Sequence, residues 1–168
     1  LFTKRNMSSE LGLTTPHVLL TLHRPSNVDN KETLEQLLSQ LIQIGETHSL
    51  VWPMHPRTRS RIEDFELETL IKKAKIHVTE PLGYIEFMSL VSSSIGVITD
   101  SGGIQEETTY LGVPCLTVRP NTERPITITE GTNKLFSFIT DFEPKAGGIE
   151  FWDGNTAQRC VESLSILL

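Results

Sequence analysis

Short apolar runs alternate with longer amphipathic stretches along the sequence. The runs are dense in Val, Leu and Ile, as expected for parallel strands that are covered on both faces. Between them, apolar residues recur every three or four positions, which is typical of helices packed on a sheet. This alternation predicts an α/β protein with a parallel sheet. The predicted strands are residues 17–23, 50–52, 76–79, 95–98, 115–118 and 135–139.

Helices are expected in the intervening stretches. The first long one follows Asp29 and Glu32, whose spacing is that of a capping box, and it extends to Gly45. Pro25 is expected to keep residues 24–27 in an irregular loop. Further helices are predicted over residues 57–65, after Tyr84, over residues 104–111 and after Asn155, the last with an apolar stripe.

Residues 97–107 combine a buried strand, two glycines and the start of a helix. Gly102 and Gly103 let the backbone approach a ligand closely, and the free N–H groups of a helix start form an anion site. Glu107 lies one helical turn beyond Gly103, where its carboxylate can accept hydrogen bonds from sugar hydroxyls. The stretch predicts a site for a nucleotide or sugar phosphate. The alternative is that the two glycines only make a tight turn.

Other polar residues follow the remaining predicted strands, and the carboxyl ends of parallel strands share one edge of a sheet, where ligands bind. Arginine, serine and backbone amides at such an edge suit a diphosphate with a sugar on each side. The segments concerned are His23 with Arg24, His55, residues 81–84, Ser101 with the glycines, and residues 119–124.

Each of these candidates has a structural alternative. His23 can be a hydrogen-bonded residue at a strand end, and His55 can shape the turn between its two prolines. Arg119 and Arg124 can form surface pairs with Glu123 or Glu130, where such pairs contribute roughly 0–1 kcal/mol. Tyr84 and Phe87 fit a core position better than a platform for a base.

Composition and charge argue against several classes of protein function. A net charge of −6 lacks the basic footprint of a nucleic-acid-binding protein, and Arg57, Arg59 and Arg61 fit a solvated helix face. Two cysteines imply no disulfide framework and suit the cytosol. No membrane span, signal peptide or metal-ligand spacing is evident. The length predicts a single domain over residues 1–168, and the start at Leu1 suggests a piece of a longer chain.

Several motifs follow one another along the chain: residues 20–24 (Leu-Thr-Leu-His-Arg), 53–56 (Pro-Met-His-Pro), 80–84 (Glu-Pro-Leu-Gly-Tyr), 99–107 (Thr-Asp-Ser-Gly-Gly-Ile-Gln-Glu-Glu), and 122–125 (Thr-Glu-Arg-Pro) with 130–132 (Glu-Gly-Thr). In this order they resemble the carboxyl-terminal half of UDP-N-acetylglucosamine 2-epimerase. Two positions depart from the family pattern: Pro25-Ser26 stands where Arg-Glu is frequent, and Ile126 where a glutamate is common.

The resemblance implies a Rossmann-like, UDP-binding domain of a two-domain GT-B enzyme, with helices on both faces of its sheet. Such an enzyme interconverts UDP-GlcNAc and UDP-ManNAc by eliminating UDP and adding it back, without metal or redox cofactor. The resemblance also implies a homodimer in the cytoplasm, an amino-terminal domain that supplies the proton-transfer carboxylates, and a last helix that packs back toward that domain. The chain alone is then expected to be inactive.

The resemblance also implies roles for individual residues. Ser101, Gly102 and Gly103 would hold the diphosphate, and Glu107 the ribose. The other roles are His23 as the catalytic residue facing the sugar and phosphate, Arg124 near the phosphates, Leu82 with Phe87 at the uracil, and Arg24 with His55 in regulation by a second UDP-sugar. The alternatives are a hydrolysing 2-epimerase, the donor domain of a GT-B glycosyltransferase, and a non-catalytic nucleotide-sugar binding module.

Overall fold

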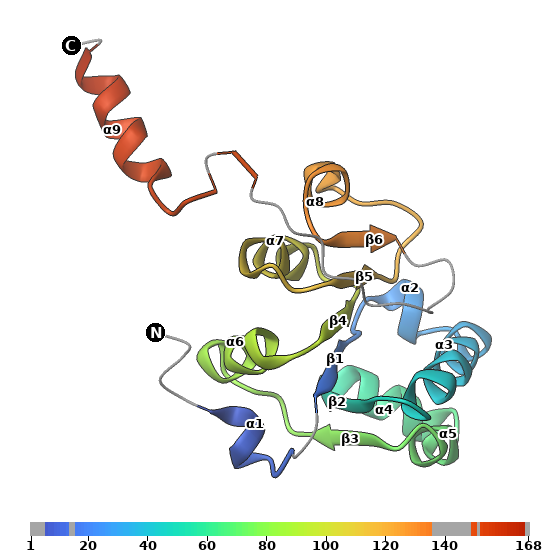
Figure 1. Ribbon diagram of the computed structural model, residues 1–168. Helices are drawn as coiled ribbons and strands as arrows, with labels where there is room; N and C mark the ends of the chain where they lie inside the picture. Colours follow the sequence, from blue (N-terminus) through green and yellow to red (C-terminus); the bar gives the residue numbers. More distant parts are fainter. Residues whose placement is uncertain (1–5, 14–15, 136–148, 151, 167–168) are drawn as a thin grey trace.

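The computed structural model describes residues 6–13, 16–135, 149–150 and 152–166. Its centre is a six-stranded sheet with the order β3-β2-β1-β4-β5-β6, in which every neighbouring pair is parallel (Figure 1). The strands are β1 (His17–Thr21), β2 (Ser49–Pro53), β3 (Ile76–Thr79), β4 (Gly96–Thr99), β5 (Cys115–Thr117) and β6 (Asn133–Leu135). The predicted α/β, Rossmann-like fold is confirmed.

The strands form where the apolar runs predict them, but β1 ends at Thr21, two residues before the predicted end, and β6 is shifted. The described part of β6 begins at Asn133, two residues before the predicted 135–139. Asn133 is fully buried because its side chain hydrogen-bonds within the protein, so a polar residue occupies a strand position there. Residues 136–139 lie outside the described part of the chain.

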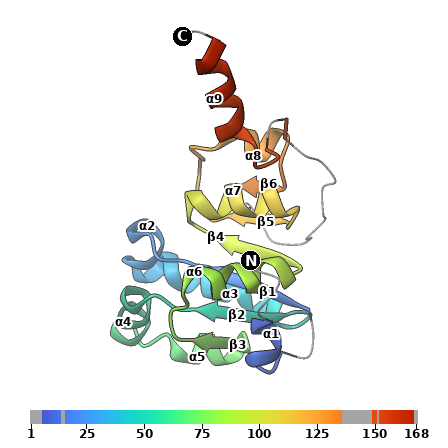
Figure 2. The ribbon, with the colours of Figure 1, turned by 90° about the vertical axis from the view of Figure 1, so that its left-hand side faces the viewer.

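Helices cover both faces of the sheet (Figures 1 and 2). One face packs on α3, α4 and α5, with Leu34, Leu38 and Ile62 in its apolar core, and the other packs on α1, α6 and α7. The helices are α1 (Met7–Glu10), α2 (Pro25–Val28), α3 (Lys31–Gly45), α4 (Pro56–Asp64), α5 (Glu68–Lys73), α6 (Tyr84–Ser93), α7 (Gly102–Leu111), α8 (Pro125–Thr129) and α9 (Thr156–Ile166). None of these helices has the length and apolar character needed to cross a bilayer.

Two local predictions before α3 are wrong. Pro25 begins the one-turn helix α2 instead of excluding it, because the first helical position needs no N–H donor. The N-cap of α3 is Asn30, whose Oδ1 accepts the Thr33 N–H at 2.8 Å. Asp29 does not form the expected capping box, since its carboxylate pairs with Arg57 and Arg61 of α4.

The last helix stands apart from the sheet. Figures 1 and 2 both show α9 extending away from the strands and the other helices. Ala157, Cys160 and Val161 of its predicted apolar stripe are exposed, Val161 to 64%. The described side chains of the stripe are therefore open to solvent.

Candidate functional site

The direction of the strand connections reverses between β1 and β4, at a topological switch point that we call the crossover point. The chain leaves β1 toward β2 and leaves β4 toward β5, so the loops after these neighbouring strands diverge. Ligands of open α/β sheets bind in the crevice at such a point. The loop after β1 carries His23 and Arg24, and the loop after β4 carries Asp100 and Ser101. Segments more than 70 residues apart in sequence therefore meet at one edge.

Helix α7 begins at this edge with two glycines that the fold itself does not require. Ser101 is the N-cap, and its side chain makes no capping hydrogen bond. A Cβ at Gly102 or Gly103 would meet no atom within 4 Å, and neither residue has a positive φ. Backbone conformation and packing thus leave the glycines unexplained, whereas a ligand close to the backbone N–H groups would explain them.

Asp100 is a functional candidate that the sequence analysis missed. Its carboxylate is fully buried and accepts hydrogen bonds from the backbone N–H groups of His23 and Arg24, at 3.0 and 2.9 Å. Asn27 Nδ2 donates at 3.1 Å, and His23 Nδ1 lies 3.1 Å from Oδ1. Burial alone would raise the pKa of Asp100, but the hydrogen bonds from His23, Arg24 and Asn27 outweigh it, and the pKa is lowered.

His23 forms the exposed end of this network. Its side chain is 44% exposed, and the hydrogen bond to Asp100 raises the pKa of its imidazole. Desolvation and the charge of Arg24 oppose that rise in the pKa without cancelling it. The structure therefore contains the contact that the structural alternative predicts, a hydrogen-bonded histidine at the end of a strand. The raised pKa also favours a cationic ring at the crossover point.

His55 lies beside His23 but has another role. The two ring centroids are 6.1 Å apart. His55 is the N-cap of α4, and its Nδ1 accepts the Arg57 N–H at 3.2 Å. The alternative that His55 shapes the turn between its prolines therefore describes its observed contact.

The loop from β5 to α8 brings further arginines to the same edge. Arg119 is 11% exposed and donates to Glu123 at 3.0 Å. Arg124 Nε lies 2.9 Å from the carboxylate of Glu106 of α7, so Arg124 pairs with that residue and not with the Glu123 or Glu130 carboxylate of the structural alternative. Arg119 lowers the pKa of Glu123 through its hydrogen bond, and the nearby charges of Arg24 and Arg124 lower it further.

Gln105 connects this loop to the start of α7, and the sequence analysis did not single it out. Its fully buried side chain donates to the Ser101 carbonyl at 3.2 Å and accepts from Thr122 at 2.5 Å and from Asn133 at 3.1 Å. Thr122 in turn accepts the Arg124 N–H at 2.9 Å. The conformation of the arginine loop is therefore tied to that of the glycine helix.

Glu107 lies one helical turn beyond Gly103 on α7, next to a small hollow. The hydroxyl of Tyr84 hydrogen-bonds to Glu107, which raises the pKa of the phenol. Tyr84 is 58% exposed, so the expectation that it is a core residue is wrong, whereas Leu82 and Phe87 are partly buried against the apolar core. The hollow has a volume of about 380 Å³ and is lined by Tyr84, Met88, Glu106, Glu107, Tyr110, Leu111 and Trp152.

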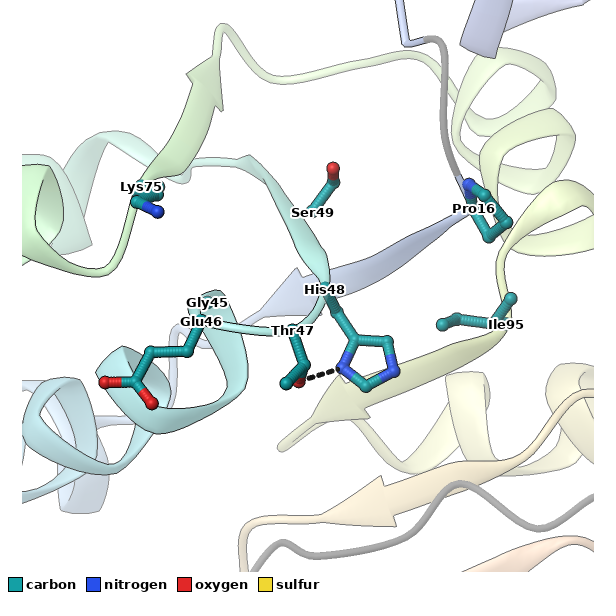
Figure 3. A pocket seen from close by; sticks show the side chains of 8 residues that line it. All are labelled: Pro16, Gly45, Glu46, Thr47, His48, Ser49, Lys75 and Ile95. Carbon is teal, nitrogen blue, oxygen red and sulfur yellow. Dashed lines mark hydrogen bonds between the residues drawn. The ribbon is translucent and has the colours of Figure 1, made fainter.

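A second hollow lies at the opposite, amino-terminal edge of the sheet (Figure 3). Its volume is about 630 Å³, and residues of the α3–β2 loop, including His48, line it together with Lys75 and Ile95. His48 Nδ1 is 2.8 Å from the Thr47 hydroxyl. None of the predicted site residues lines this hollow.

The remaining reactive groups lie away from both edges or are inert. Within the described residues, no three His, Cys, Asp or Glu side chains are grouped as a metal site. Burial raises the pKa of the Cys115 thiol to about 12, and Cys160 is exposed on α9.

Known proteins share this sequence and fold. The family model described as UDP-N-acetylglucosamine 2-epimerase matches residues 2–165. The enzyme of that name from Methanocaldococcus jannaschii is 45% identical over 122 residues, which is 71% of this chain and 33% of that protein. Its structure superposes with a TM-score of 0.85 at 34% identity, covering 98% of this chain and 51% of that one.

A structure of UDP-GlcNAc 2-epimerase from Neisseria meningitidis bound to UDP-GlcNAc has a TM-score of 0.73 at 30% identity. It is covered to 49%, and this chain to 98%. The chain thus spans about half the length of these solved relatives. Because the family model matches nearly all of its residues, the chain belongs to the UDP-N-acetylglucosamine 2-epimerase family.

Proposed function

We propose that this chain is the UDP-binding half of a UDP-GlcNAc 2-epimerase and that it holds the diphosphate at the start of α7. The observation that carries the proposal is the pair of glycines at the crossover point, which neither packing nor backbone conformation requires. The Neisseria relative, whose structure contains UDP-GlcNAc, supports the choice of ligand.

The proposed binding roles follow the geometry of the edge. Ser101, Gly102 and Gly103 donate hydrogen bonds to the diphosphate, and Arg124 adds positive charge beside it. Glu107 lies on α7 beyond the glycines and accepts hydrogen bonds from the ribose hydroxyls. Leu82 and Phe87 contribute the apolar side of the uracil pocket, which continues from the core beneath α6.

The proposed reaction makes specific demands on this edge. Removal of the proton at C2 of the sugar and breakage of the C1–O bond give a 2-acetamidoglucal and UDP. Re-addition of UDP and of a proton on the other face of C2 gives UDP-ManNAc. The first step places new negative charge on the departing diphosphate, and donors already in position stabilise that charge. His23, with its raised pKa, supplies a cation there.

We assign the proton-transfer groups to an amino-terminal domain, because the relatives are about twice as long as this chain. The apolar stripe of α9 would pack against that domain, and the complete enzyme would be a cytoplasmic homodimer. Arg24 and His55 are our candidates for contacts with a second, regulatory UDP-sugar. The departure at Pro25 and Ser26 keeps the hydrolysing reaction as the second candidate, in which water adds in place of UDP.

Titration calorimetry of the 168-residue chain tests the ligand. We expect UDP and UDP-GlcNAc to compete for one site and ADP to bind more weakly, because the uracil pocket is matched to a pyrimidine. A folded chain, verified by circular dichroism, that binds neither UDP nor UDP-GlcNAc would contradict the proposal.

Product analysis tests the division of labour. The chain alone should not convert UDP-GlcNAc, and the polypeptide with its amino-terminal domain should release UDP-ManNAc. Free ManNAc together with UDP would instead identify the hydrolysing reaction. Turnover by the 168-residue chain alone would show that the proton-transfer groups are not in the other half.

A further inference from the structure

We propose that Asp100 is a positioning residue that orients the His23 imidazole, with Nδ1 toward the protein and Nε2 toward the bound diphosphate. This inference rests on the proposed function and adds a residue that acts on the ligand only through His23.

The carboxylate of Asp100 holds His23 at two points. Its oxygens accept the backbone N–H of His23, at 3.0 Å, and lie 3.1 Å from Nδ1 of the ring. An ionised carboxylate is an acceptor only, so Nδ1 must carry a proton. With both the backbone and the ring attached to the same group, the side chain has little freedom to rotate. Nε2, on the far side of the ring from Nδ1, points away from Asp100.

The network has a structural part and an exposed part. The N–H groups of His23 and Arg24 and the amide of Asn27 satisfy the buried carboxylate from within the fold. The imidazole is the fourth donor and the only one of the four on a side chain that is nearly half exposed, at 44%. Without the ring, three donors would still compensate the charge. We therefore infer that the ring contact serves the ligand.

The contact has a consequence for the dependence of binding on pH. The charged groups that face His23 are Asp100, which raises its pKa, and Arg24, which lowers it, while the ring of His55 is 6.1 Å away. Because the pKa of His23 is raised, the imidazolium is present below that value and is lost as pH increases through it. Affinity for a diphosphate should therefore be highest on the acid side of the transition and fall on the alkaline side.

The test uses UDP-GlcNAc, since each phosphate of a UDP-sugar carries one ester and one anhydride bond and has no proton that titrates near neutrality. A terminal phosphate, as in UDP, loses a proton near pH 6 (about 6 in phosphomonoesters) and would obscure the result. Calorimetry on the chain from pH 5.5 to pH 9 should show an affinity loss of roughly tenfold. Uridine, which lacks phosphates, should show no such loss. The His48→Ala variant is the matched control and should keep the full profile.

Two variants separate positioning from folding. Asp100→Asn places an amide N–H₂ or a neutral oxygen against the four donors, so the transition should move to lower pH. His23→Gln keeps the other three donors of Asp100 and should remove the transition entirely. An unchanged transition in a folded Asp100→Asn chain would overturn the inference.

Nitrogen-15 NMR of the wild-type histidines provides a measurement that needs no Asp100 variant. His23, assigned by its loss in His23→Gln, should keep its proton on Nδ1 when the ring is neutral. A neutral ring protonated on Nε2 would overturn the inference, as would a flat pH profile for UDP-GlcNAc, and the proposed function would survive both results. Absence of UDP-GlcNAc binding at every pH would overturn the proposed function together with the inference.

Discussion

The carboxyl-terminal and amino-terminal edges of the sheet hold their polar groups in different ways. At the carboxyl-terminal edge, a buried charge at Asp100 is satisfied by four donors and connects to the exposed ring of His23. At the amino-terminal edge, the 630 Å³ hollow is lined by surface groups such as His48, which contacts the adjacent Thr47 (Figure 3). The polar groups of the carboxyl-terminal edge are therefore the more highly organised ones.

The glycines of the two edges differ in the same way. Gly45 lines the amino-terminal hollow, and a Cβ there would lie 2.1 Å from the Ala74 carbonyl oxygen, so close packing explains this glycine. A Cβ at Gly102 or Gly103 would meet nothing within 4 Å. Helix N-termini also face the carboxyl-terminal edge, whereas helices end at the other edge, where carbonyl groups repel anions. A glycine that neither packing nor backbone conformation requires is thus a better marker of a ligand site than the volume of a hollow.

The largest effect on UDP binding is expected from a substitution of Gly103, at the carboxyl-terminal edge. In Gly103→Val, the new side chain should occupy the space next to the amides of α7 and weaken UDP binding roughly 100-fold, or about 2.8 kcal/mol. Thermal unfolding should change little, because a Cβ at this position meets no neighbouring atom within 4 Å. Calorimetry and a melting curve together test both parts. A variant that binds UDP as wild type does would show that the ligand lies elsewhere.

The Gly45→Ala variant should have the opposite effects, with a loss of stability and no change in UDP affinity. Because the new Cβ would collide with the Ala74 carbonyl, α3 or the segment before β3 must shift, and we expect a loss of about 1–3 kcal/mol or more in unfolding free energy. Urea denaturation measures that loss. The folded fraction should bind UDP with wild-type affinity. A fall in affinity without a fall in stability would contradict the separation of the two edges.

The Glu107→Gln variant tests whether the carboxyl-terminal edge binds the ribose of UDP. Loss of the charge should weaken UDP binding about tenfold, since hydrogen bonds to charged groups contribute roughly 1.5–3 kcal/mol. Calorimetry with 2′,3′-dideoxy-UDP provides the control, because that ligand lacks the hydroxyls that Glu107 would bind. Equal UDP affinities in the variant and the wild type would exclude the ribose role.

The smallest effect is expected for His48→Ala. The ring contacts the exposed Thr47 hydroxyl at the amino-terminal edge, so its loss should change the unfolding free energy by no more than about 0.5 kcal/mol. UDP affinity should not change. If His48→Ala weakened UDP binding, the amino-terminal hollow would have to be included in the site.

The sequence predicted the elements of the fold better than their connections. Apolar runs located the strands, and the helix predicted over residues 104–111 does end at Leu111, where Gly112 is the C-cap with a φ of +70°. Strand order depends on pairing between distant segments, which periodicity does not contain. Local capping choices were also missed, because Asn30 and Asp29 are equally good caps by type, and only the position of Arg57 and Arg61 on α4 decides between them.

The same limit applies to the site. The motifs brought Ser101, Gly102 and Gly103 to attention, and the family they indicated is confirmed. Asp100 lies within the same motif but was not identified, because its donors lie 73 to 77 residues earlier in the chain. Gln105 was missed because its partners Thr122 and Asn133 come from other segments. A residue whose role is to hold another can be identified only when both partners are placed in space.

The unequal environments of the two cysteines give this protein a site for selective chemical labelling. Only thiolates react with maleimide dyes, and a buried Cys115 with a pKa of about 12 supplies almost none at neutral pH. Cys160 is exposed on α9. One dye would therefore attach to the helix that stands apart, and its fluorescence anisotropy would report how that helix moves while the nucleotide edge stays unmodified.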